Sequence, residues 1–302
     1  MLNRNRRRCS ALAAALATCA LTATACTATA APVSQVSPLP ALGMPSDAAN
    51  TQATRATSTT STTPAAPAST PAGASAAQAS AASLTGKVVV IDPGHNGGNA
   101  SHAAEIAKLV PMGFGQYKTC DTTGTDGDDG YPEYAFTLSV SDLVAQLLEQ
   151  RGIKVVMTRT TNDGVGPCVN QRAAIGNDAH ADAAISIHGD GFGASGHGFQ
   201  IIQATRSEGG VTNDARSNEL SRALHATFVS ESGLTAATYI GDNGYETRSD
   251  LAGLNLSTVP KVLVELGNMK NPGDIALMES TSGRARFAKA IADGILDYLT
   301  QS

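Results

Sequence analysis

The 302-residue sequence contains no tryptophan, few other aromatic residues (4% in all), and no apolar run long enough to cross a bilayer as a helix. Basic residues are scarce beyond the N-terminus: the first 30 residues contain four of the 21 basic residues and none of the 26 acidic ones. The remainder therefore carries a net charge of about −9. Such a chain is a poor candidate for binding nucleic acid or anionic lipid through charge. We expect that the protein has no nucleic-acid partner and recognises its ligand at a local site. Since nothing in the sequence indicates an oligomer, we expect a monomer.

Residues 1–30 have the pattern of an export signal. Four arginines between positions 4 and 8 precede an apolar stretch, Ala11 to Leu21, that is too short to span a bilayer. Small residues suited to cleavage follow at Ala23 to Ala25. An uncleaved anchor and lipid attachment at Cys26 are the alternatives, although Ala23 stands where a lipid-attachment motif usually has leucine. We expect an exported protein, in the periplasm or cell wall or secreted, with a lipid anchor left open.

Residues 31–84 differ in composition from everything that follows them. They are dominated by Ala, Ser, Thr and Pro, with one acidic residue (Asp47), one basic residue (Arg55) and no aromatic ring. Such a segment cannot bury enough apolar surface to offset the entropy of ordering, so we expect a disordered tether. Residues 85–302 are then a single domain, long enough for a substantial core.

Only two of the five cysteines, Cys120 and Cys168, lie outside the N-terminal signal region. Two cysteines in the folded part of an exported protein most often pair with each other, so we expect a disulfide. Two free thiols or a pair of metal ligands are the alternatives.

Strand and helix patterns alternate along the domain. Short β-branched runs indicate strands, and apolar residues at three- and four-residue spacing indicate helices. The predicted strands are 87–91, 153–157, 183–187, 198–203 and 261–264; the predicted helices are 133–151, 170–180, 214–230, 272–279 and 284–299. This alternation predicts an α/β fold. The long segment 96–131, rich in Gly, Asp and Thr, has no clear pattern; we interpret its acidic run, 121–130, as a solvated loop and expect the segment to border a substrate groove.

Three of the apolar runs end directly on side chains that can bind a metal. The first is followed by Asp92-Pro93-Gly94-His95, the second ends on His188, and the third ends on Glu265. Sites in open α/β sheets form outside the carboxyl ends of the strands, so these three side chains are expected to meet in one crevice. A core imidazole at His188 and a turn residue at His95 are the ordinary alternatives for each histidine alone.

Catalytic zinc takes three protein ligands and leaves one position for water, and a further carboxylate serves as general base. His95 and His188 with one carboxylate would supply the ligands. Two glutamates suit the remaining roles: Glu133 opens a predicted helix, where the helix dipole alone would favour it, and Glu265 ends a buried strand, where an unpartnered charge is costly.

These motifs in this order resemble the zinc-dependent N-acetylmuramoyl-L-alanine amidases of the amidase-3 type. The resemblance rests on Asp92 to His95, Glu133, Ser186 to His188 and Val264 to Gly267, and covers most of residues 84–302. It implies one zinc ion per chain on His95, Glu133 and His188, with Glu265 as catalytic base, in a single domain with a twisted, mostly parallel sheet of about six strands flanked by helices. The small mycobacterial and actinobacterial cell-wall amidases, which carry one disulfide, are the most similar group.

The resemblance also implies a substrate and a reaction. The enzyme would hydrolyse the amide between N-acetylmuramic acid and L-alanine in peptidoglycan or muropeptide fragments, in wall remodelling or fragment recycling. Arg248 is a candidate for holding a stem-peptide carboxylate, with a surface ion pair to Asp250 or Glu246 as the alternative. A zinc peptidase acting on wall peptides and a non-catalytic peptidoglycan-binding domain are the competing functions. The sequence departs from the family pattern at Gly189 and Asp190, where asparagine is common shortly after the second histidine.

Overall fold

The structure is a computed structural model that describes residues 84–301. The expected export signal (1–30) and nearly all of the expected tether (31–84) lie outside the described residues. Within residues 84–301, no helix is both long enough and apolar enough to cross a membrane.

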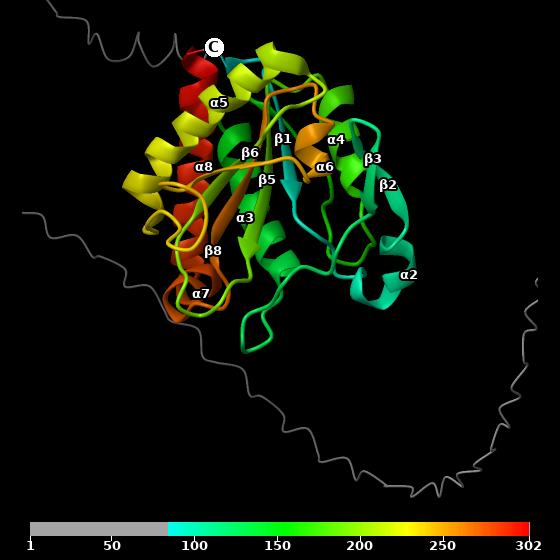
Figure 1. The fold of residues 1–302 in the computed structure, drawn as a ribbon. Coiled ribbons are helices and arrows are strands. Elements are labelled where there is room, and N and C mark those ends of the chain that lie inside the picture. Colours follow the sequence, from blue (N-terminus) through cyan, green and yellow to red (C-terminus); the bar gives the residue numbers. More distant parts are fainter. Residues whose placement is uncertain (1–83, 302) are drawn as a thin grey trace, which may run out of the picture. The chain divides into compact units, whose positions relative to one another are not determined.

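A six-stranded sheet forms the centre of the domain (Figure 1). Four strands run parallel, a fifth pairs antiparallel with β8, and the sixth runs parallel to the fifth. In spatial order the strands are β4 (Lys154–Met157), β1 (Val88–Pro93), β5 (Ala183–Asp190), β8 (Lys261–Asn268), β6 (Gln200–Ala204) and β7 (Tyr245–Arg248). The prediction of a single α/β domain with a mostly parallel, six-stranded sheet is therefore confirmed.

The central strands are covered on both faces, and their alternating side chains enter a main core on one face and two small clusters on the other. In β1, Val89 and Ile91 belong to the main core, whereas Val90 packs into a smaller cluster on the opposite face. In β8, Val264 belongs to the main core and Leu263 to another small cluster on the opposite face. Burial on both faces explains why these strands appear in the sequence as continuous apolar runs.

Three long helices cover the face that carries the main core: α3 (Glu133–Glu149), α5 (Gly210–Thr227) and α8 (Thr281–Gln301). The α5 helix continues into a wider turn, η2 (Phe228–Ser232), and α7 (Pro272–Glu279) packs against the start of α8. Fully buried aromatic residues join two of these helices to each other: Phe136 of α3 meets Phe287 of α8 edge to face, with ring centroids 6.2 Å apart. Figure 1 shows α5 and α8 together on one side of the sheet.

The opposite face carries shorter elements (Figure 1). These are α4 (Val169–Asp178), α6 (Ala252–Asn255) and the antiparallel hairpin of β2 (Leu109–Gly113) with β3 (Gln116–Thr119). Segment 96–131, which has no clear periodic pattern in the sequence, therefore contains this hairpin together with η1 (Ala100–His102) and α2 (Ala103–Ile106). Its elements are too short for a periodic signal to emerge.

The antiparallel direction of β6 follows from a missing crossover helix. The chain leaves the carboxyl end of β5 at Asp190 and enters β6 at Gln200 after a short loop. Because the loop returns to the sheet at the same end of the strands, β6 must run opposite to β5 and β8.

A disulfide joins Cys120, directly after β3, to Cys168, directly before α4. It ties the hairpin segment to the helix that covers β1. The two cysteines are 48 residues apart in the sequence, so the bridge closes a long loop.

We predict that replacing both cysteines with serine lowers the free energy of unfolding by about 2–4 kcal/mol, because the unfolded chain gains the entropy of an open loop. Urea denaturation of the oxidised protein and the double variant measures this difference. Reductant should lower the midpoint of the unmodified protein and leave that of the double variant unchanged. Equal midpoints for the oxidised protein and the double variant would contradict the prediction.

Candidate metal and active site

The two histidines lie at the carboxyl ends of neighbouring strands. His188 is in β5, and His95 follows β1 in a left-handed backbone conformation with φ at +56°. Gly94 permits this approach: a Cβ atom at position 94 would lie 2.4 Å from Cε1 of His188. A side chain at position 94 would therefore displace the His188 ring.

Glu133 completes a compact cluster with the two histidines. Its Oε1 lies 2.9 Å from Nδ1 of His188, and its Oε2 lies 3.3 Å from Nε2 of His95. One ligand atom from each residue lies within 4.8 Å of the others, so a single ion fits among them. The structure thus brings together His95, Glu133 and His188, although they come from the segment after β1, the first turn of α3 and β5.

The cluster is strongly coupled electrostatically. Burial alone would raise the pKa of Glu133, but the two imidazoles and their hydrogen bonds hold it well below its usual value. Burial alone would lower the pKa of His95, but the carboxylates of Glu133 and Asp121 raise it to about 10. The carboxylates thus favour a positive charge at this position, and a cation that binds to Nε2 of His95 competes with a proton for it.

Backbone groups and a second carboxylate orient the ligands. The backbone N–H groups of Thr125 and Gly189 donate to the two oxygens of Glu133, at 2.9 Å and 3.2 Å. The Nδ1 atom of His95 lies 3.1 Å from the carbonyl oxygen of Thr122 and 3.3 Å from Oδ1 of Asp121. These contacts leave Nε2 of His95 facing Glu133, as expected for an imidazole oriented by a carboxylate behind it.

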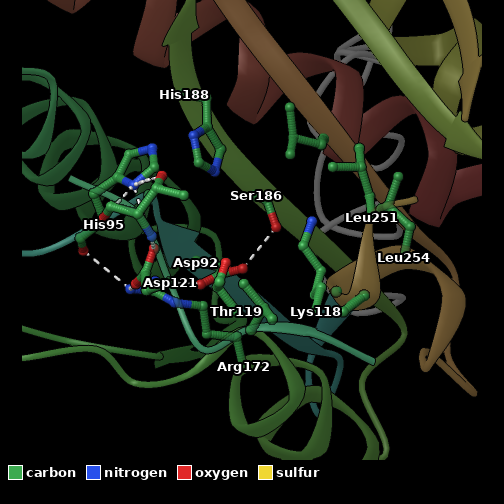
Figure 2. Close-up of a pocket in the computed structure, with 16 residues that line it drawn as sticks. Asp92, His95, Lys118, Thr119, Asp121, Arg172, Ser186, His188, Leu251 and Leu254 are labelled. Atoms are coloured by element: carbon green, nitrogen blue, oxygen red, sulfur yellow. Dashed lines mark hydrogen bonds and ion pairs between the residues drawn. The ribbon is translucent and has the colours of Figure 1, made fainter. Parts of the chain in front are cut away.

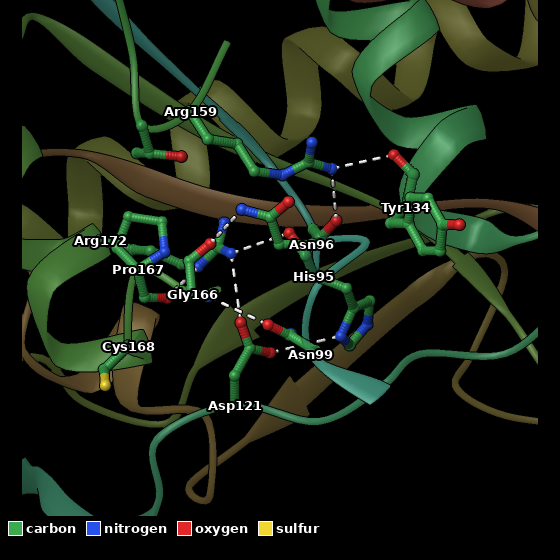
Figure 3. Close-up of polar contacts among 12 residues, drawn as sticks. His95, Asn96, Asn99, Asp121, Tyr134, Arg159, Gly166, Pro167, Cys168 and Arg172 are labelled. Carbon is green, nitrogen blue, oxygen red and sulfur yellow. Dashed lines mark hydrogen bonds and ion pairs between the residues drawn. The ribbon is translucent and has the colours of Figure 1, made fainter. Parts of the chain in front are cut away.

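Two arginines hold the backbone around His95 (Figure 3). Arg172 of α4 donates to the carbonyl oxygen of His95 at 3.0 Å and to Oδ2 of Asp121 at 3.2 Å. Arg159 donates to the carbonyl oxygens of Gly94 and Tyr134, each at 2.9 Å. Asp121 is thus buried and structural, and our interpretation of the 121–130 run as a solvated loop is wrong for its first residue. Only its position directly after Cys120 could have indicated this role.

Asp92 lies beneath the site as the centre of a buried charge network. Its carboxylate accepts from Arg172 at 2.9 Å, Lys261 at 3.1 Å, Ser186 at 2.6 Å and Thr158 at 2.7 Å. Burial would raise the pKa of Asp92, but these cations and hydroxyls lower it far below its ordinary value of 3.8. Figure 2 shows Asp92 between Ser186 and Arg172, below the two histidines.

Glu265 stands beside His188, its register partner across the β5–β8 pair. Its Oε2 atom is inaccessible to solvent and has no hydrogen-bond partner among the described residues. Burial and the nearby carboxylates of Glu133 and Asp190 raise its pKa well above the ordinary glutamate value. A carboxyl group with a raised pKa and a free oxygen next to a candidate metal site can carry a proton.

Arg248 lies in β7, where it pairs with Ala204 of β6 in the register of the sheet. Its guanidinium is near enough to Glu265 for its positive charge to oppose the rise in the pKa of that carboxyl group. Its guanidinium binds Asp250, with Nη2 2.6 Å from Oδ2 and Nε 2.8 Å from Oδ1. The structure therefore places Arg248 in a surface ion pair, on the same face of the sheet as the site.

A cavity of about 150 Å³ opens beside the two histidines (Figure 2). Residues of α6 and β8, among them Leu251, Leu254 and Leu263, give it an apolar wall. Lys118 of β3 lines it with a half-buried amine that donates to the carbonyl oxygen of Asp250 at 2.8 Å. Segment 96–131 thus contributes residues to the rim of the cavity, which also includes Thr119, Asp121 and Thr122.

Fold and site together define an α/β protein with a candidate metal site at the carboxyl edge of its sheet. The sequence profile of the N-acetylmuramoyl-L-alanine amidase family matches residues 89–297. The chain therefore belongs to this family.

Individual relatives agree with this assignment. The chain is 41% identical over 214 residues to N-acetylmuramoyl-L-alanine amidase Rv3717 of Mycobacterium tuberculosis, an alignment that covers 71% of this chain and 87% of the relative. The crystal structure of the amidase Ami1 from Mycobacterium smegmatis is similar with a TM-score of 0.69 and 40% identity, over 72% of this chain and 99% of that one. Ami1 from Mycobacterium abscessus gives a TM-score of 0.68 and 45% identity, over 72% and 100%.

We predict that Asp92→Asn destabilises the protein at neutral pH by about 3–5 kcal/mol, because Arg172 and Lys261 lose their buried counter-charge. The folded-state pKa of Asp92 is depressed, so its contribution to stability is present above about pH 4 and is lost as the pH falls below it. Denaturant unfolding at several pH values should therefore show a shallower acid decline for the variant. Asp293→Asn, in an exposed pair with Lys289, is the control and should leave the dependence of stability on pH nearly unchanged. An equal acid decline in Asp92→Asn and in the unmodified protein would refute the role of Asp92.

Proposed function

We propose that this protein is a zinc-dependent N-acetylmuramoyl-L-alanine amidase that hydrolyses the amide between N-acetylmuramic acid and L-alanine in peptidoglycan or its fragments. The main support is the pairing of a three-ligand cluster with an unpartnered, protonatable Glu265 on the adjacent strand. Family membership and the names of the relatives supply the substrate and the bond.

The donor set fits zinc. Two imidazoles and one carboxylate are typical ligands of catalytic zinc, and among residues 84–301 the buried Glu133 forms ion pairs with the two histidines alone. We assign one zinc ion per chain to His95, Glu133 and His188. When bound, zinc supplies Lewis acidity that polarises an amide carbonyl and eases the ionisation of water.

The chain's own residues carry the proton and position the substrate. Glu265 accepts a proton from the attacking water and delivers it to the nitrogen of the departing L-alanyl peptide. Its raised pKa suits the first step, because a carboxylate whose pKa is raised is a stronger base toward the proton of water. The cavity beside the histidines would take the first part of the stem peptide, with its small apolar wall against the alanine methyl group.

Wall remodelling and fragment recycling are both compatible with this reaction. We place it outside the cytoplasm, in the periplasm or cell wall or secreted, since a disulfide is at home in an oxidising compartment. The presence of all four site residues argues against a non-catalytic binding domain.

We predict that Glu265→Gln retains one zinc ion per chain and loses activity by a factor of about 10² or more, because the amide cannot accept the proton of water. Metal analysis and release of L-alanyl peptide from muramoyl-dipeptide measure the two effects. Glu219→Gln, on the exposed side of α5, is the matched control and should behave as the unmodified enzyme. His188→Ala should lose both metal and activity.

Full activity of Glu265→Gln would reject the assigned base. Cleavage of an unrelated peptide in preference to muramoyl-dipeptide would favour the zinc peptidase. Activity that survives complete removal of metal by a chelator would reject zinc dependence.

We propose that Arg248 binds a carboxylate of the stem peptide. Its guanidinium is about one-third exposed (36%), and its partner Asp250 is a surface residue that a substrate carboxylate could replace. We predict that Arg248→Gln raises KM about tenfold for a tripeptide-bearing muropeptide, and less for a substrate whose distal carboxylates are amidated. Steady-state kinetics on both substrates test this, and equal KM increases would show that Arg248 acts only through local structure.

A further inference from the structure

Two aromatic rings stack on each other at the rim of the site. Phe192 follows His188 by four residues, and its ring lies on that of Tyr239 with centroids 4.4 Å apart and planes inclined by 14°. The Phe192 side chain is 49% exposed. One face of its ring rests on Tyr239, so the exposed area belongs to the other face and the ring edge.

Tyr239 connects the stack to the catalytic strand ends. Its hydroxyl donates to Oδ2 of Asp190 at 2.8 Å, and Nε2 of Gln200 donates to that hydroxyl at 3.0 Å. Asp190 ends the strand that carries His188, and Gln200 is the register partner of Glu265. The inner ring of the stack is thereby fixed to the strands that carry one candidate ligand and the candidate base.

The loop that carries Phe192 is held rigidly by the strand of Glu265. The side-chain oxygen of Asn268 accepts from the backbone N–H of Phe192 at 3.0 Å, and its nitrogen donates to the carbonyl oxygens of Gly193 and Gly196 at 3.0 Å and 2.7 Å. The Asn271 side chain donates to the carbonyl oxygen of Ala194 at 2.8 Å. An exposed phenylalanine on an anchored loop offers a flat apolar surface at low entropic cost to a ligand.

We infer that the Phe192–Tyr239 stack is a sugar subsite, on which a pyranose ring of the N-acetylmuramoyl glycan lies during the reaction. This inference rests on the proposed amidase function. The face of a pyranose from which its axial C–H bonds project is weakly positive and apolar, and it matches the negative face of an aromatic ring. Within residues 84–301, no phenylalanine or tyrosine lines the cavity beside the histidines, whereas the stack offers such a face on the loop that follows β5.

Three variants separate the ring from its surroundings. Phe192→Leu keeps an apolar side chain and removes the flat face, and Phe192→Tyr keeps the face. Gly196→Ala keeps the phenylalanine side chain but disturbs the stack, because a Cβ atom there would lie 2.6 Å from Tyr239 and 2.8 Å from Phe192 and would displace one of the two rings. Val229→Ala, an exposed apolar residue beyond α5, is the control.

Two substrates with the same scissile amide isolate the sugar: N-acetylmuramoyl-L-alanyl-D-isoglutamine and D-lactoyl-L-alanyl-D-isoglutamine, which lacks the pyranose. We predict that Phe192→Leu and Gly196→Ala raise KM for the muramoyl substrate about five- to tenfold with little change in kcat. Their KM for the lactoyl peptide should match that of the unmodified enzyme. Phe192→Tyr and Val229→Ala should have the same KM as the unmodified enzyme on both substrates. Equal losses on both substrates, or none on the muramoyl substrate, would overturn the sugar subsite.

A binding measurement keeps this test separate from the proposed reaction. Saturation-transfer NMR with a peptide-free N-acetylglucosaminyl-N-acetylmuramic acid disaccharide should show contact with the unmodified protein and clear loss in Phe192→Leu. If the unmodified protein cleaves neither peptide, the proposed function fails, and this measurement alone decides the subsite. Disaccharide binding that is as strong in Phe192→Leu as in the unmodified protein would overturn the sugar subsite.

Discussion

The buried carboxylate of Asp92 is the constraint on which the rest of this structure depends. An ionised carboxylate is costly to bury unless cations and hydrogen-bond donors surround it. Here the donors come from different parts of the chain: Ser186 from β5, Lys261 from β8, Thr158 from the segment after β4 and Arg172 from α4. Satisfying one charge therefore fixes the relative positions of all four parallel strands and of a covering helix.

The same network sets the geometry of the site above it. Arg172 reaches past Asp92 to the carbonyl oxygen of His95 and to Asp121, whose carboxylate lies behind the His95 ring. In the neighbouring strand, Ser186 is held by Asp92 and lies two residues before His188. Both histidines are thus positioned from below by one set of buried contacts, and ligand orientation and fold stability have a common origin.

How much the sequence could predict follows from the range of the interactions involved. Strands buried on both faces leave continuous apolar runs, so Val262 to Val264 identified the strand that carries Glu265, although β8 continues to Asn268, and the parallel sheet followed. The direction of β6 depends on how a short loop returns to the sheet, which no periodic pattern records. Arg248 shows the consequence: it precedes the Glu265 strand in sequence, yet it lies in β7, which pairs with the reversed β6. The role of Asp121 was hidden because its partners come from distant segments.

The two sides of the site differ in a way that fits the two halves of the proposed substrate. A glycan strand is a stiff polymer without a free end near most of its peptides, so an enzyme can approach it only with an open surface. A stem peptide is flexible and can enter a recess. The cavity lined by Leu251 and Leu254 is a recess, whereas the Phe192 ring is exposed on an anchored loop. The histidines and Glu265 lie near the carboxyl ends of the parallel strands, where the recess and the exposed ring meet. A scissile amide at the junction of a rigid polymer and a flexible branch would need that arrangement.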